Sequence, residues 1–274
     1  MPTVQSRDAH EIFYRSDCIA PPWVDPPQTV LMHHGVALNG DAWAGWLPRL
    51  LAAGFRVVRI DMRGFGRSGR VNAEHRWSID QFFADVDAVL AELQVDSFHF
   101  VGESLGGLIG LALAARRPAS VRSLCLLSTP FDGSRIGPAL DTWRDIIDRD
   151  GMPGWAAALM PMRFAPEYAD TRVRRWVEEL QASCDPHAVW GQAQFIRTQN
   201  LTSELPAIKA PTLILAPDGS PFVGTSLARD LHQLLPGSEI RWYPGERHSL
   251  LLSRGDDCAA AFVEFMARRA RIAA

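Results

Sequence analysis

The chain has 274 residues, 47% of them hydrophobic and 22% charged, and a formal net charge of −3 at pH 7. These values are ordinary for a globular protein and argue against a disordered chain, a collagen or a coiled coil. The near balance of charge gives no electrostatic reason to expect nucleic acid as a partner. No apolar run approaches the roughly 20 residues that span a bilayer, so no membrane partner is expected. The polar N-terminus lacks the basic start and apolar core of a secretory signal, which favours a cytoplasmic protein.

Short apolar runs predict β-strands along the chain. Several are continuous rather than alternating, as is typical of parallel strands covered on both faces. The predicted strands are 29–35, 55–64, 97–104, 121–128, 212–217 and 239–245. The Pro-rich stretch 19–27 precedes them and predicts a loop, because proline removes a backbone donor and fixes φ.

Helical patterns lie between these runs, and 78–93 is the clearest. Ser78 and Gln81 have the spacing of a capping box, and apolar residues then recur every three or four positions. Further helices are predicted over 41–53, 105–116, 225–235 and 256–270. Alternation of strands and helices predicts right-handed βαβ units, and therefore an α/β fold with a mostly parallel sheet flanked by helices.

The alternation stops between residues 133 and 207. This stretch is rich in proline, has helical pieces such as 141–149 and 171–182, and contains no convincing strand. We expect a core of residues 1–132 and 208–274, and a helical cap insertion of residues 133–207 over the carboxyl edge of the sheet. Its Trp and Met side chains predict an apolar substrate pocket. The candidates for that pocket are Trp143, Trp155 and Met160.

The segment Gly102–Gly107, with the sequence GESLGG, carries the strongest chemical signal. It matches the pattern G-x-S-x-G, follows an apolar strand and opens a helix. Glycines lack Cβ, so the strand and the helix can approach closely around the serine. The helix N-terminus also brings N–H groups toward developing negative charge. This context predicts a reactive Ser104 rather than an idle serine in a Gly-rich turn.

Three further segments make the chain resemble the α/β-hydrolase superfamily over nearly its whole length. Residues 34–36 (HGV) are similar to the family's oxyanion loop, and residues 61–68 (DMRGFGRS) to a turn common in the family. Residues 245–249 (GERHS) place His248 after the last predicted strand, as the family's histidine is placed. The resemblance implies an eight-stranded sheet with a cap inserted after strand six. In this family the segment 102–107 is similar to the turn that carries the nucleophile, called the nucleophile elbow. Serine at this elbow distinguishes the chain from haloalkane dehalogenases and epoxide hydrolases, which use Asp there.

Catalytic roles follow from this resemblance. Ser104 would attack a carbonyl carbon, and His248 would take its proton and return it to the leaving group. The backbone amides of Val36 and Leu105 would form the oxyanion hole.

Three other polar residues near these segments are expected to be structural. His33 and His34 adjoin the oxyanion loop and are expected to shape it. Glu103 lies inside the elbow, where we expect a structural hydrogen bond near the cap rather than the role of catalytic acid.

The family's catalytic triad has a third member, an acid that holds the histidine, and here the sequence departs from the family pattern. The family places Asp directly before a Pro after strand seven, and Ser220 stands there in this chain. Asp218, two residues earlier, is our first candidate, because Gly219 would allow a remodelled turn to bring its carboxylate to His248. Asp132, after strand six, is the second candidate. The remaining possibilities are Glu246 or no acid at all.

These residues predict a serine hydrolase that cleaves a carboxylic ester of a small, largely apolar substrate through an acyl-enzyme. The alternatives are a hydrolase of C–C bonds or enol-lactones, a cofactor-free peroxidase or acyltransferase, and a catalytically weak homologue that binds a small ligand. No metal site and no cofactor are expected. The expected partner is a small-molecule substrate, and the chain could be a monomer or a homodimer.

Overall fold

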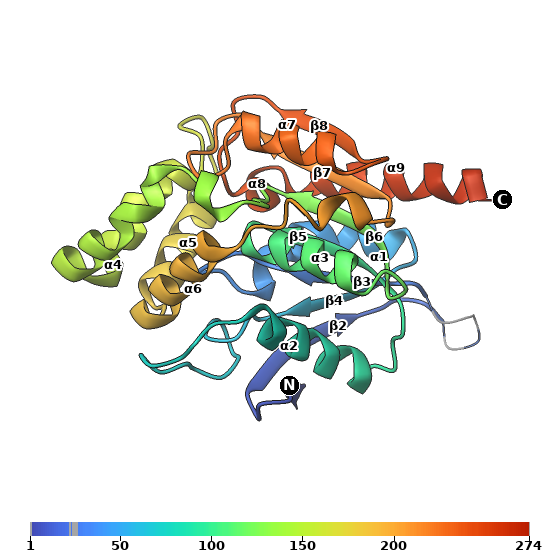
Figure 1. Cartoon of the computed structure of the whole chain (residues 1–274), viewed down its shortest axis with the longest axis horizontal. Coiled ribbons are helices and arrows are strands. Elements are labelled where there is room, and N and C mark those ends of the chain that lie inside the picture. Colours follow the sequence, from blue (N-terminus) through green and yellow to red (C-terminus); the bar gives the residue numbers. More distant parts are fainter. Residues whose placement is uncertain (1, 22, 24–26, 274) are drawn as a thin grey trace.

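One β-sheet organises the molecule (Figure 1). The computed structural model of the chain describes residues 2–21, 23 and 27–273, so the predicted loop 19–27 lies partly outside the described residues. Within the described residues, eight strands pair in the order β1-β2-β4-β3-β5-β6-β7-β8. From β4 onward in that order neighbouring strands are parallel, whereas β1, β2 and β4 pair antiparallel. The predicted mostly parallel eight-stranded sheet is confirmed.

The six predicted strands are all present, one at its predicted bounds (212–217) and the other five shorter. They are β3 (Thr29–His33), β4 (Arg56–Ile60), β5 (Phe98–Glu103), β6 (Val121–Leu127), β7 (Thr212–Pro217) and β8 (Glu239–Tyr243). The sequence did not reveal the hairpin of β1 (Thr3–Gln5) and β2 (Glu11–Asp17) at the sheet edge. An edge strand is held largely by backbone hydrogen bonds and tolerates polar residues, so the polar N-terminus carried little strand signal.

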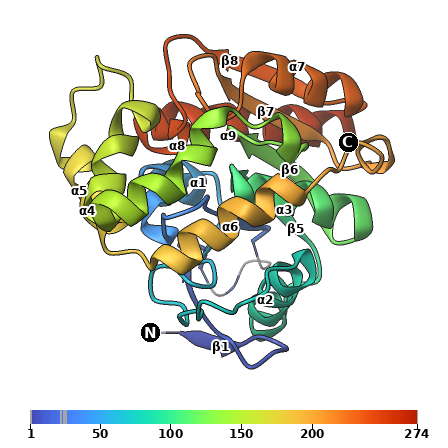
Figure 2. The ribbon, with the colours of Figure 1, turned by 60° about the vertical axis from the view of Figure 1, so that its left-hand side comes forward.

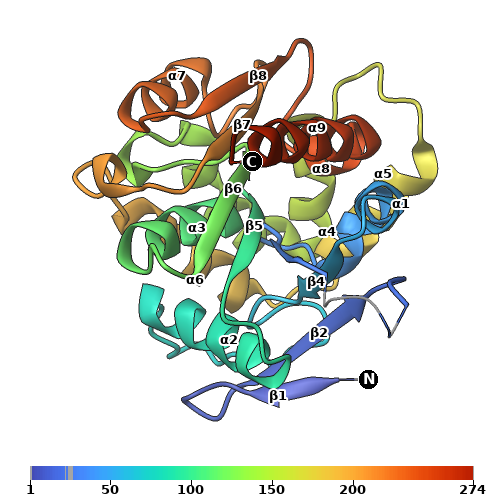
Figure 3. The ribbon, with the colours of Figure 1, turned by 90° about the vertical axis from the view of Figure 1, so that its right-hand side faces the viewer.

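Helices cover both faces of the sheet (Figure 3). One face carries η1 (Gly40–Trp46), α1 (Leu47–Ala52), α8 (Leu250–Ser253) and α9 (Gly255–Ala273). The other carries α2 (Ile79–Glu92), α3 (Leu105–Arg116) and α7 (Thr225–Leu234). The predicted capping box of α2 is present, since the Ser78 and Gln81 side chains each bond the other's backbone N–H. The single helix predicted over 41–53 is instead a 3₁₀ turn followed by α1, which begins near Pro48.

The segment between β6 and β7 is helical. It contains η2 (Gly133–Arg135), η3 (Pro138–Thr142), α4 (Trp143–Arg163), α5 (Thr171–Ala182), α6 (Pro186–Thr198) and η4 (Leu205–Ala207). We call residues 133–207 the insertion. The helix predicted over 141–149 extends to Arg163 and is kinked at Gly151, whose φ is 68°. Helices α4, α5 and α6 lie together at one end of the sheet (Figure 2). In the described part of the chain, no helix is both long and apolar enough to cross a membrane.

The motif 61–68 has a structural task. The Asp61 carboxylate accepts the backbone N–H of Gly40 at 2.7 Å and that of Arg67 at 2.8 Å, which ties two loops together. Arg63 is fully buried and donates from Nε to Asp85 on α2 at 2.7 Å. The charge of Arg63 is therefore compensated inside the fold, as buried charges require.

Buried histidines predict how stability depends on pH. Burial is the chief cause that lowers the pKa of His33 and His248 to about 3, and that of His34 and His99 to about 4. In the unfolded chain the pKa of a histidine is about 6.5, so the unfolded state binds protons first as the pH falls.

We therefore expect the free energy of unfolding to be full above about pH 6.5 and to fall by up to about 1.4 kcal/mol per pH unit for each such histidine toward pH 4. Urea unfolding between pH 7 and pH 5 measures this slope. The variant His99→Asn, away from the pocket described below, should have a flatter slope. A free energy that is constant over this range would contradict the expectation.

Candidate active site

Loops at the carboxyl ends of four parallel strands converge on one small pocket. Val36 follows β3, Ser104 follows β5, Phe222 follows β7 and His248 follows β8. All four line the pocket. The sheet topology thus brings together residues that are far apart in the sequence, at the edge where open α/β sheets usually bind their ligands.

Ser104 occupies a strained turn between β5 and α3. Its φ is 54° and its ψ is −117°, a conformation that a residue with a side chain rarely adopts. The turn is possible because two glycines allow close backbone approach. A Cβ on Gly102 would lie 2.6 Å from the carbonyl carbon of Gly106, and one on Gly106 would lie 2.1 Å from the carbonyl oxygen of His33. The predicted strand–turn–helix context of Ser104 is therefore present.

The two amides predicted for an oxyanion hole lie on either side of Ser104. Leu105 is the first residue of α3, so its N–H has no partner within the helix. Val36 lies in the loop after β3 and lines the pocket. His34 holds this loop, because its Nδ1 donates to the Gly35 carbonyl at 2.7 Å and its Nε2 accepts from Met62 N–H at 2.8 Å. The loop-shaping role predicted for His34 fits these contacts, while the oxyanion role of the two amides stays a prediction.

His248 is buried in the pocket with its two ring nitrogens in different surroundings. Nδ1 lies 3.0 Å from the hydroxyl oxygen of Ser220. Nε2 lies 3.7 Å from Oε1 of Glu103. The ring also packs edge-on against Phe222, with centroids 4.9 Å apart. Burial, and then the charge of Arg163, lower the pKa of His248 to about 3, so its imidazole is neutral near pH 7.

The contact predicted between Asp218 and His248 is wrong. The Asp218 carboxylate accepts the backbone N–H of Gly245 at 2.8 Å on the exposed turn after β8, and Ser220 takes the place beside Nδ1. Asp218 is therefore exposed on the surface and does not line the pocket that holds His248.

The two alternative acids also have other partners. Asp132 caps η2 by accepting from the backbone N–H and the hydroxyl of Ser134. Glu246 accepts from the hydroxyl of Ser253 at 2.7 Å. Among the described residues, the acidic side chain placed next to His248 is Glu103.

Glu103 and Arg163 bring two buried ionisable groups into the pocket. Glu103 is fully buried, neither carboxyl oxygen has a hydrogen-bond partner among the described side chains, and burial raises its pKa to about 7. Arg163, the last residue of α4, donates to the Val36 carbonyl at 3.0 Å and to the Ser249 hydroxyl at 3.1 Å. The structural hydrogen bond expected for Glu103 is not found with any described side chain. Nothing in the sequence distinguished Arg163 from the other arginines.

The pocket itself is small and mostly apolar. Its volume is about 30 Å³, which is room for about one water molecule. Besides the residues above, its apolar lining consists of Pro130, Ile136, Leu140, Trp143, Ile196 and Val223. Trp143 therefore lines the pocket as predicted, but Trp155 and Met160 do not. Trp155 packs behind Trp143 at a distance of 5.0 Å between ring centroids. Met160 packs into the apolar layer on the face of the sheet that carries α1 and α9.

The sequence profile of the alpha/beta hydrolase fold family matches residues 28–254, which span β3 to α8 and include every pocket residue. The chain belongs to the α/β-hydrolase family. A non-heme haloperoxidase of Rhodococcus erythropolis is 27% identical to it over 287 residues, covering 97% of this chain and 99% of the relative.

Two solved structures have the same fold as this chain. The enol-lactonase from Burkholderia xenovorans LB400 superposes with a TM-score of 0.86 at 25% identity, covering 97% of this chain and all of that one. An esterase from Exiguobacterium antarcticum superposes with a TM-score of 0.84 at 22% identity, covering 96% and 98%. These proteins share one fold but carry different activities, so family membership alone leaves the substrate open.

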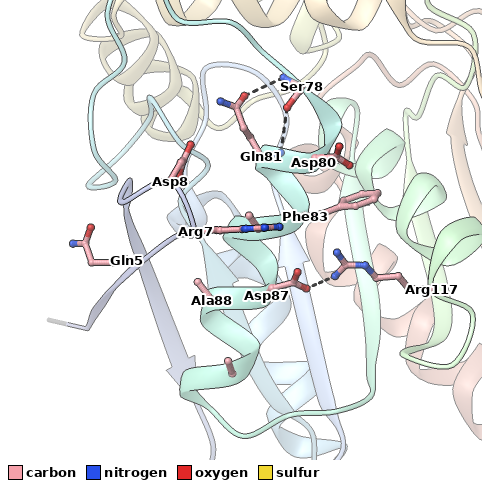
Figure 4. Close-up of a pocket in the computed structure, with 12 residues that line it drawn as sticks. Gln5, Arg7, Asp8, Ser78, Asp80, Gln81, Phe83, Asp87, Ala88 and Arg117 are labelled. Carbon is pink, nitrogen blue, oxygen red and sulfur yellow. Dashed lines mark hydrogen bonds and ion pairs between the residues drawn. The ribbon is translucent and has the colours of Figure 1, made fainter.

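A larger hollow of this α/β-hydrolase lies elsewhere (Figure 4). It has a volume of about 740 Å³ and lies between the N-terminal hairpin and α2. Its lining mixes both signs of charge, with Arg7, Asp80, Asp87 and Arg117 among the side chains drawn. Neither Ser104 nor His248 reaches it, and nothing in it resembles the group of reactive side chains around Ser104.

The close approach at Gly106 predicts a large effect of a single methyl group. In Gly106→Ala the new Cβ would meet the His33 carbonyl at 2.1 Å, so strand and helix must separate. We expect a loss of about 3 kcal/mol or more in the free energy of unfolding. In the control Gly45→Ala the new Cβ lies 4.0 Å from its nearest neighbour, Gly255. That change should stay within about 0.5 kcal/mol of the parent. Urea unfolding compares the two, and equal stabilities would contradict the assignment of the turn.

Proposed function

We propose that this α/β-hydrolase cleaves a carboxylic ester of a small, largely apolar substrate through an acyl-enzyme. The observation that carries the proposal is the position of Ser104. It sits at φ 54° on the turn between β5 and α3, in the same small pocket as His248. A serine held in a strained conformation, beside a titratable group and the first N–H of a helix, is arranged for nucleophilic attack.

The reaction divides into two acyl transfers. The Ser104 oxygen adds to the ester carbonyl, and the resulting oxyanion accepts from the N–H groups of Leu105 and Val36. A neighbouring base takes the Ser104 proton and returns it to the leaving alcohol, for which His248 is the sequence-based candidate. Water then attacks the acyl-enzyme in the same way and releases the carboxylic acid.

The size and lining of the pocket support a short acyl group. A space of about 30 Å³ beside Ser104, walled by Leu140, Trp143 and Phe222, leaves little room for a long chain. The comparison with the enol-lactonase supports the same bond class, because an enol-lactone is itself an ester. One observation favours a catalytically weak, ligand-binding homologue instead, namely the hydroxyl of Ser220 where a carboxylate would normally face His248.

Replacement of the nucleophile tests the proposal. We expect Ser104→Ala to lower kcat/KM for p-nitrophenyl acetate by at least about 1000-fold, because among the described residues that line the pocket Ser104 alone carries a hydroxyl or thiol. The parent should also be labelled once, at Ser104, by a p-nitrophenyl phosphonate, as read by mass spectrometry. The control Ser238→Ala removes a serine hydroxyl near the end of α7 that bonds His232. Equal turnover by the parent and Ser104→Ala would exclude this function.

The wall formed by Trp143 predicts how the acyl chain is selected. The parent should hydrolyse p-nitrophenyl acetate faster than the octanoate. Trp143→Ala opens the pocket beside Phe222, so we expect kcat/KM for the octanoate to rise by about 10-fold while that for the acetate changes little.

Trp176→Ala is the matched control for this prediction. Trp176 lies on α5 and packs against the apolar layer that includes residues of α1 and α9. Its removal should leave the ratio of the two rates unchanged. A Trp143→Ala enzyme with the parent's ratio would show that Trp143 does not limit the acyl chain.

A further inference from the structure

The hydrogen bonds of Ser220 determine which nitrogen of His248 carries the proton. The Ser220 hydroxyl oxygen accepts the backbone N–H of Phe222 at 3.3 Å and that of Val223 at 3.1 Å. A hydroxyl has two acceptor positions and one hydrogen, so these two bonds leave it only the hydrogen to offer. The remaining neighbour is Nδ1 of His248 at 3.0 Å, which must therefore accept. The neutral ring then carries its own hydrogen on Nε2.

This tautomer is the wrong one for a general base. The Ser104 proton would have to pass to Nε2, which is already protonated. A carboxylate in the position of Ser220 would have the opposite effect, because it accepts from Nδ1–H and leaves Nε2 free. The exchange of an acceptor for a donor at residue 220 therefore removes from His248 the role that the sequence predicts for it.

Glu103 stands where a replacement base is needed. Its Oε1 lies 3.7 Å from Nε2 of His248, the nitrogen that carries the hydrogen. A point built as a Cβ on Gly35 lies 2.1 Å from Oε2 of Glu103 and 3.0 Å from the Cβ of Ser104, so both side chains border one small space. Both carboxyl oxygens are buried and have no partner among the described side chains. An acidic group that borders the same space as the nucleophile and has no side-chain partner of its own is a candidate to accept its proton once a substrate is bound.

We propose that Glu103 is a catalytic residue of this site, the general base that takes the proton of Ser104 in place of His248. The inference rests on the proposed ester hydrolysis. As the Ser104 oxygen bonds to the carbonyl carbon, its proton passes to the Glu103 carboxylate and the carbonyl electrons move onto the oxygen. When the C–O bond to the alcohol breaks, Glu103 returns that proton to the leaving oxygen. Water repeats the sequence in deacylation, and His248 stays neutral with its Nε2–H facing the carboxylate at 3.7 Å.

The electrostatics of the pocket suit this role. The ionisable groups that face Glu103 are Arg163 from α4 and His248 from the loop after β8. Burial raises the pKa of Glu103 to about 7, while the positive charge of Arg163 and the Gly35 N–H oppose that rise. A base whose pKa lies near the working pH is both ionised and strong enough to accept a proton. His248 remains neutral over the same range, since its pKa is lowered to about 3.

The first test removes the carboxylate and keeps its shape. We expect Glu103→Gln to lower kcat/KM for p-nitrophenyl acetate by about 100-fold or more, while its thermal unfolding matches that of the parent. The parent's kcat/KM should fall as the pH drops through about 7, as Glu103 becomes protonated. The residual activity of Glu103→Gln should lack that dependence. The matched control Glu179→Gln changes an exposed residue of α5 and should behave like the parent.

The second test restores a conventional triad. In Glu103→Gln/Ser220→Asp the new carboxylate can accept from Phe222 N–H and Val223 N–H and also from Nδ1 of His248, which moves the ring hydrogen to Nδ1 and frees Nε2. We expect this second change to recover at least about 10-fold of the activity that Glu103→Gln loses. A Glu103 side chain that served only to support the fold would give no such recovery.

The outcomes separate this inference from the proposed function. If the parent neither hydrolyses esters nor is labelled at Ser104, the proposed function fails. If Ser104→Ala is inactive but Glu103→Gln stays within about 3-fold of the parent, or keeps the parent's pH dependence, the role of Glu103 is overturned alone. A folded double variant that recovers nothing would also overturn it.

Discussion

Ser104 can face the pocket only because α3 begins almost in contact with the strands that precede it. The missing side chains at Gly102 and Gly106 let the first turn of α3 meet the end of β3, where a single added carbon would lie 2.1 Å from the His33 carbonyl. Ser104 then takes a φ of 54° that its own backbone would not favour. Sheet and helix packing impose this conformation, and the surrounding loops are arranged around it.

The sequence predicted the parts of the fold whose signal is periodic. Buried parallel strands read as apolar runs, and α2 combines a cap at Ser78 with an apolar stripe, so their positions followed directly. Strand β2, which pairs with β1 and β4, was missed because polar residues at both of its ends leave an apolar signal only at its centre. Helix α4 was underestimated because Gly151 and Pro153 interrupt a helix that resumes beyond them.

The candidate site divides in the same way. Ser104 and His248 could be located because a turn motif and the end of a late strand fix where each residue lies. The partner of His248 could not, because the direction of Asp218 depends on the path of one turn, and there its carboxylate meets the Gly245 amide. The surroundings of Glu103 were equally hidden, since the loop after β3, the end of α4 and the turn holding His248 all have to close over it before it is buried. Sequence spacing gives the order of such residues but not the direction in which each side chain points.

Arg163 joins the insertion to the core at the edge of the pocket. Its guanidinium belongs to the insertion, yet it holds the carbonyl of Val36 and the hydroxyl of Ser249 in the core. The walls of the pocket come from both parts as well, with Leu140 and Trp143 from the insertion and Val36 from the core. The carbonyl that Arg163 binds belongs to the peptide that follows Val36, next to the peptide that carries the Val36 N–H. Loss of this one guanidinium would therefore loosen the insertion and the loop after β3 together.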